Sequence, residues 1–95
     1  MYFITCFLNF ETDYLDNFRT FGFFSDYEDC RRALNGNWCD MHEFYYDFAV
    51  VECMEEGIHS HAKQMAWFRW SEEKKGFYET ENPDWANGYC NFALG

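Results

Sequence analysis

Four side chains with metal-binding chemistry lie near the middle of the chain. Cys39 and His42 are three positions apart, and His59 and His61 follow in a polar stretch. Thiolate and imidazole groups are the ligands that tetrahedral zinc prefers. The spacing does not match a zinc finger, which pairs two cysteines with two histidines three to five residues apart. We therefore predict no cofactor, and keep a zinc protein built on these four residues as an alternative.

The five cysteines could supply a nucleophile, but little in the chain would activate one. A thiolate needs a positive neighbourhood, whereas the chain has 17 Asp and Glu against 7 Lys and Arg. The cysteines are odd in number and widely spaced. We expect reduced and mostly buried thiols, which is the usual state of free cysteine. The residues concerned are Cys6, Cys30, Cys39, Cys53 and Cys90.

Neighbouring carboxylates could in principle perform acid–base chemistry. Glu55 and Glu56 are adjacent, as are Glu72 and Glu73, and Glu79 and Glu81 alternate. A general acid and a general base need different environments inside one cleft, and these pairs fall at expected turns and strand ends. The acids of 11–16 also lack the glycine and the final Glu of a calcium loop. The sequence therefore predicts a protein that is not an enzyme.

The hydrophobic pattern predicts the elements that carry these groups. A capping box, Ser25 to Glu28, starts a helix that Asn35-Gly36 ends in left-handed geometry. Tyr27, Cys30 and Leu34 form its apolar stripe. Alternating or apolar runs predict strands over 2–9, 19–24, 45–54, 64–71, 77–81 and 89–93. The order β-β-α-β-β-β-β predicts an α+β fold in one domain, 1–95, with a mostly antiparallel sheet of about five or six strands and one main helix packed on one face.

Aromatic residues are the other unusual feature of the composition, with 12 Phe, 7 Tyr and 4 Trp. In the strand 64–71, alternation places Trp67 and Arg69 on one face and Phe68 and Trp70 on the other. If the helix covers one face only, rings on the other face are open to a partner. We therefore predict Trp67 and Trp70 as anchors of an interface, with cross-strand ring pairing inside the hairpin as the alternative.

The formal net charge of -10 limits the classes of molecule that the protein is expected to bind. Nucleic acid and anionic membranes attract clustered Lys and Arg, so we expect no direct contact with either. No basic leader or apolar run of membrane length is seen, and we expect a cytoplasmic protein. The predicted partner is a protein with a basic surface. The carboxylates predicted to bind it are Glu11, Asp13, Asp16, Glu55, Glu56, Glu72, Glu73, Glu79 and Glu81.

Four stretches of the chain resemble a family of small uncharacterised acidic bacterial proteins that are also found on mobile elements such as prophages. The stretches are FGFFSDYEDCRRAL, YDFAVVECMEEGI, WFRWSEEKKGFYE and CNFALG. The resemblance spans nearly the whole chain and brings no functional residues with it. A mobile-element origin implies an inhibitor of a bacterial defence nuclease, similar to anti-CRISPR proteins, that mimics nucleic acid on a basic surface.

Two further functions stay open at this point. An aromatic-lined pocket between sheet and helix would make the protein a small-molecule or peptide binder. An exposed strand edge would allow a homo-oligomer. The first predicts thermal stabilisation by a ligand with little dependence on salt, and the second predicts a larger particle in light scattering.

Overall fold

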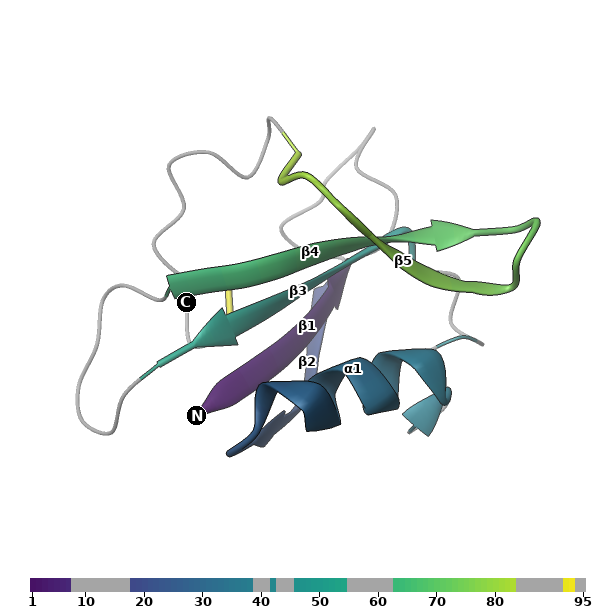
Figure 1. The fold of residues 1–95 in the computed structure, drawn as a ribbon. Coiled ribbons are helices and arrows are strands. Elements are labelled where there is room, and N and C mark those ends of the chain that lie inside the picture. The colour runs from purple at the N-terminus through teal and green to yellow at the C-terminus, as the bar shows by residue number, and fades with distance from the viewer. Residues whose placement is uncertain (8–17, 39–41, 43–45, 55–62, 84–91, 94–95) are drawn as a thin grey trace.

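A five-stranded antiparallel sheet with one helix forms the described part of the protein (Figure 1). The computed structural model describes residues 1–7, 18–38, 42, 46–54, 63–83 and 92–93. The elements follow the chain as β1 (Tyr2–Phe7), β2 (Phe18–Phe24), α1 (Tyr27–Asn35), β3 (Phe48–Cys53), β4 (Lys63–Ser71) and β5 (Gly76–Thr80). The strands lie in the order β2-β1-β3-β4-β5, and each neighbouring pair is antiparallel. The predicted α+β class is confirmed, and the order of elements along the chain is as predicted from β1 to β5.

Some predicted element boundaries change. The strand expected over 45–54 is shorter, Phe48–Cys53, because the chain at Tyr46 and Asp47 is already outside the regular ladder. The last predicted strand, 89–93, lies mostly outside the described residues, and its described part, Phe92 and Ala93, forms a bend. The bend places Phe92 against the sheet, with 4% of its surface exposed.

The start of α1 is capped one residue later than predicted, whereas its end is capped at Gly36 as predicted, without the left-handed conformation expected there. The N-cap is Asp26 instead of Ser25, and its carboxylate accepts a hydrogen bond of 2.9 Å from the Glu28 amide. A carboxylate suits this position because the helix dipole is positive there. At the other end Gly36 has φ -95°, and the left-handed residue is Asn37, with φ 56°. Asparagine tolerates this conformation better than most residues.

The turn after α1 gives a testable prediction. The Oδ1 atom of Asn37 also accepts a hydrogen bond of 2.7 Å from the His42 amide. Asn37→Ala removes this bond and places at positive φ a residue that tolerates this conformation less well than asparagine. We therefore expect about 1–2 kcal/mol lower stability in urea unfolding. Asn37→Gly loses the same bond but tolerates the φ value, so it should cost clearly less. Equal losses for both variants would show that the left-handed conformation is unimportant.

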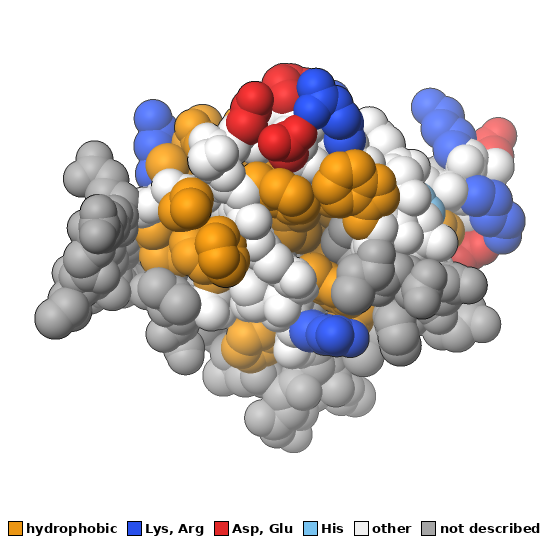
Figure 2. Space-filling view, turned by 90° about the horizontal axis from the view of Figure 1, so that it is seen from below, with side chains coloured by type: hydrophobic (Ala, Val, Ile, Leu, Met, Phe, Trp, Pro, Cys, Tyr) orange, Lys and Arg blue, Asp and Glu red, His pale blue; other side chains and the backbone are white. Residues whose placement is uncertain are grey.

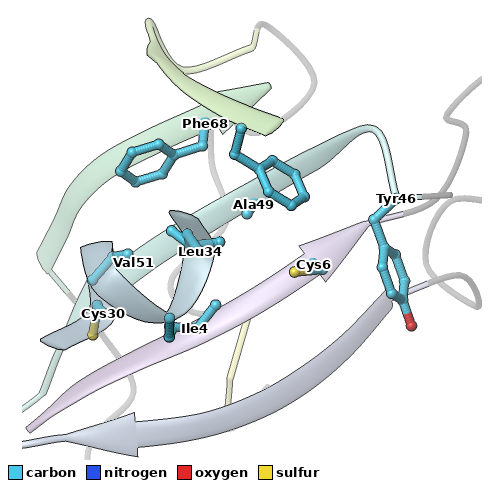
Figure 3. Packing of buried hydrophobic residues seen from close by; sticks show 10 residues of the cluster. Ile4, Cys6, Cys30, Leu34, Tyr46, Ala49, Val51 and Phe68 are labelled. Atoms are coloured by element: carbon cyan, nitrogen blue, oxygen red, sulfur yellow. The ribbon is translucent and has the colours of Figure 1, made fainter. Parts of the chain in front are cut away.

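The main core lies between α1 and one face of the sheet. Cys30 and Leu34 of α1 point toward Ile4 of β1 and Val51 of β3 (Figure 3), as the predicted stripe requires. Burial raises the pKa of the Cys30 thiol to about 11 and that of Cys6 further, so both thiols stay protonated. The buried members of this cluster are Ile4, Cys6, Cys30, Ala33, Leu34, Tyr46, Ala49, Val51, Phe68 and Phe77.

A second, smaller cluster covers the opposite face. Phe7 stacks on Trp67 with ring centroids 5.7 Å apart, and Phe92 meets the Phe7 ring edge-on at 4.8 Å. Val50 completes the buried set. The predicted alternation of β4 is therefore correct, since Trp67 and Phe68 belong to different clusters. The sheet is covered on both faces in this region, and the open face assumed for Trp67 does not exist there.

Candidate functional site

The predicted acidic surface can be followed only in part. Glu72, Glu73, Glu79 and Glu81 are described and exposed on the β4–β5 hairpin and just after it. Glu72 and Glu73 lie in the turn of this hairpin, Glu79 lies on β5, and Glu81 follows the far end of β5. The other predicted carboxylates, Glu11, Asp13, Asp16, Glu55 and Glu56, lie outside the described residues.

Two of the four hairpin carboxylates are paired. Glu72 accepts bonds from Lys75 Nζ at 2.8 Å and from Trp70 Nε1 at 2.9 Å, and these contacts lower its pKa, Lys75 first. Glu79 forms a 2.8 Å salt bridge with Arg31 of α1. Both pairs are exposed to solvent, so each contributes little to stability. The charges of Glu72 and Glu79 are thus partly neutralised by Lys75 and Arg31.

The remaining two hairpin carboxylates, Glu73 and Glu81, have no salt-bridge partner among the described residues. Every Lys and Arg of the chain lies in the described ranges, and three of the seven already pair with Glu79, Asp29 and Glu72. With 17 carboxylates in the chain, internal ion pairs cannot neutralise the excess. Among the described carboxylates of this excess, Glu73 and Glu81 are exposed to solvent.

The two predicted tryptophan anchors have different surroundings. Trp67 is 3% exposed, and its Nε1 donates to Gln64 Oε1 at 3.0 Å. It belongs to the core and has no surface to offer a partner in this structure. Trp70 is partly buried and packs edge-on against Phe77, with centroids 5.4 Å apart.

An open pocket of about 320 Å³ lies beside Trp70. His42, Trp70, Glu72 and Lys75 line it. The His42 ring packs against Trp70 at 5.0 Å, and its Nε2 bonds the Leu34 carbonyl oxygen. Because a carbonyl can only accept, Nε2 carries a proton and Nδ1 is the ring atom left for a ligand. The pocket combines two ring walls with one ion pair.

The proposed zinc ligands fall mostly outside the described residues. Cys39, His59 and His61 are among the positions not described, and only His42 can be placed. Within the described ranges, no group of three or more His, Cys, Asp or Glu is arranged to hold a metal. His42 itself uses Nε2 for the Leu34 carbonyl, so it could ligate only through Nδ1.

Sequence reasoning missed Glu52, the most unusual carboxylate in the described structure. Glu52 is 0% exposed on the central strand β3. Its Oε1 and Oε2 accept bonds of 3.1 and 3.0 Å from the Phe92 amide, and Oε1 accepts a third, of 3.1 Å, from Ala93. Burial raises its pKa, and the two amides partly oppose that shift. The available signal was one acid inside the apolar run Phe48–Met54.

Exposed rings beside β2 were also missed. Phe23 is 59% exposed and Trp38 is 45% exposed, which is unusual for large aromatic side chains. Phe23 packs against Phe3 with centroids 5.5 Å apart, and Trp38 packs against Phe24 at 5.8 Å. Alternation in RTFGFF indicated a strand but not that the strand would be outermost.

Comparisons with known proteins give no relative for this chain. No family model matches it, and neither a curated protein nor a solved structure matches it at the significance required. No helix among the described residues has the length and apolar character needed to span a lipid bilayer.

Proposed function

We propose that the protein is a non-catalytic interaction module that binds a basic surface on another protein. The observation that carries the proposal is the carboxylate excess, which seven Lys and Arg cannot neutralise. Three of these cations are already committed to Asp29, Glu72 and Glu79. Two others lie over rings, Arg19 over Phe21 at 4.6 Å and Arg69 over Phe48 at 5.5 Å.

Clustered Lys and Arg on a protein surface are the electrostatic signature of a nucleic-acid-binding site. A carboxylate excess can occupy them in place of phosphates, and it accelerates encounter at low salt. The resemblance to small mobile-element proteins adds the more specific proposal that the partner is a bacterial defence nuclease, which the protein would inhibit by competing with nucleic acid. Buried thiols at Cys6 and Cys30 are consistent with a role that needs no nucleophile.

The hairpin carboxylates provide the direct test. The double variant Glu73→Lys and Glu81→Lys changes the net charge by four units at exposed positions without salt bridges, so we expect at least tenfold weaker binding to a basic nucleic-acid-binding domain at about 0.1 M salt. Affinity is measured by fluorescence anisotropy on a panel of purified RNA-guided and restriction nucleases.

A charge exchange on the same hairpin is the matched control. Glu73→Lys combined with Lys74→Glu keeps the net charge and alters neither strand. It should bind like the wild type. If the double reversal binds as tightly as the wild type, the hairpin is not part of the surface that meets the partner.

A second candidate function rests on the pocket beside Trp70. Its volume of about 320 Å³ and its His42 and Trp70 walls suit a small planar ligand. This function predicts binding that quenches tryptophan fluorescence, depends weakly on salt and is lost in Trp70→Ala. Competition by duplex DNA for the same partner would favour the first function over this one.

A further inference from the structure

One edge of the sheet lacks the charges that usually protect an edge. β2 is an outer strand, hydrogen-bonded to β1 alone among the described strands. Its sequence, FRTFGFF, holds a single charged residue, Arg19, whose guanidinium lies over the Phe21 ring. The other outer strand, β5, carries Glu79 bridged to Arg31 and is flanked by Lys75 and Glu81. Exposed edges without charges are sites where a further strand can pair.

Exposed rings flank the β2 edge on both faces of the sheet. Phe23 packs on Phe3, which pairs with it across the strands, on the face away from α1. Trp38 packs on Phe24, which joins the core on the α1 face. A register shift leaves an extra residue at Phe21, so Gly22–Phe24 is the regular part of the edge nearest the rings. A strand added there would meet a ring with its side chains on either face.

Carboxylates border this surface. β2 runs directly into Asp26 and Glu28 at the start of α1, and both are exposed. Figure 2, which looks at the molecule from below, shows hydrophobic side chains gathered on this side, with a group of acidic side chains and an adjoining basic one at their border. An extended segment lying along β2 would therefore be favoured if it carried Lys or Arg between apolar residues.

A second copy of the chain is the less suitable occupant. Each copy carries a net charge of -10, so two copies repel each other at an edge that is itself bordered by acids. We infer that β2, Phe23 and Trp38 form the docking surface for an extended, Lys- or Arg-bearing segment of the partner protein, which adds to the sheet beside β2. This inference rests on the proposed function, because it adds a second contact of the same basic partner, at the edge of the sheet opposite the β4–β5 hairpin.

The inference is tested with a synthetic nine-residue peptide that alternates Lys and Val. Its N-methylated twin keeps the charge and side chains but lacks alternate backbone N–H donors. We expect the plain peptide to bind at about 0.1 M salt, the twin to bind at least about tenfold more weakly, and hydrogen exchange to slow at β2 amides and not at β5 amides.

Variants separate the rings from the charge. Phe23→Ser should weaken peptide binding about tenfold or more, while Tyr78→Ser, at a 43% exposed ring on β5, should leave it unchanged. Thermal melting checks that both variants fold.

Equal binding of both peptides, or of Phe23→Ser and wild type, would overturn β2 as the docking site and leave the proposed function standing. Failure of the peptide and of every basic domain to bind would overturn both. A dimer that Phe23→Ser dissolves would show that the occupant is a second copy.

Discussion

Glu52→Ala should lower the free energy of unfolding by about 3–5 kcal/mol, enough to leave a domain of this size close to unfolded. The substitution leaves the Phe92 and Ala93 amides without the carboxylate that they bond at 3.0–3.1 Å. The Phe92 amide is buried and the Ala93 amide is partly buried. An orphaned buried amide costs about 1–3 kcal/mol, and the missing side chain adds a cavity in a fully buried site. Urea unfolding followed by tryptophan fluorescence measures the loss.

Glu52→Gln is the matched control for this position. The amide keeps the volume and one acceptor oxygen, so we expect a smaller loss than for alanine. A Glu52→Ala variant within about 1 kcal/mol of wild type would show that the C-terminal bend is not held by this carboxylate.

Glu52 also gives a pH dependence with a definite sign. Burial raises its pKa above the ordinary 4.5, so the folded protein binds this proton more tightly than the unfolded chain. Its contribution to stability is therefore greatest below pH 4.5 and declines as the pH rises through the raised pKa. Burial also raises the pKa of Asp47, although the nearby Arg69 partly opposes this shift. Glu52→Gln should remove the part due to Glu52, and an unchanged profile in that variant would contradict the assignment.

Trp67→Ala should cost about 3–5 kcal/mol, the range for deleting a large buried ring. Trp67 joins Phe7 and Phe92 into one cluster, with centroids 5.7 and 5.8 Å away. Its loss removes the cover on the face away from α1 and loosens the bend that Glu52 holds. The same urea titration reports the change.

Trp70 on the same strand is the comparison for Trp67. It faces the α1 side and is only partly buried, so Trp70→Ala should cost less than half as much. If the two variants lose equal stability, Trp67 contributes no more to the free energy of unfolding than the partly buried ring of Trp70.

The parts of the fold that could be predicted are those that depend on the local spacing of apolar residues. Alternation in β4 separated Trp67 from Phe68 because strand side chains alternate whatever they pack against. The helix was predicted because Cys30 and Leu34 follow its period, although Asp26 and not Ser25 caps it. These features depend only on residues a few positions apart.

Contacts between distant residues could not be predicted. Trp67 was predicted as an anchor because one helix was expected to leave a face open, and nothing near Trp67 indicates that Phe92 covers it. The pairing of Glu79 with Arg31, 48 positions away, is equally invisible to periodicity. Glu52 is an acid in an apolar strand, but its amide partners lie 40 and 41 positions further on.

We propose that the carboxylate excess binds a basic partner in place of nucleic acid. The most direct measurement is competition between this protein and duplex DNA for one purified DNA-binding nuclease, repeated from about 0.05 to 0.3 M salt. We expect the protein to displace the duplex and its own affinity for the nuclease to fall steeply as salt rises. Displacement that does not depend on salt, or a ternary complex with the duplex still bound, would contradict this proposal.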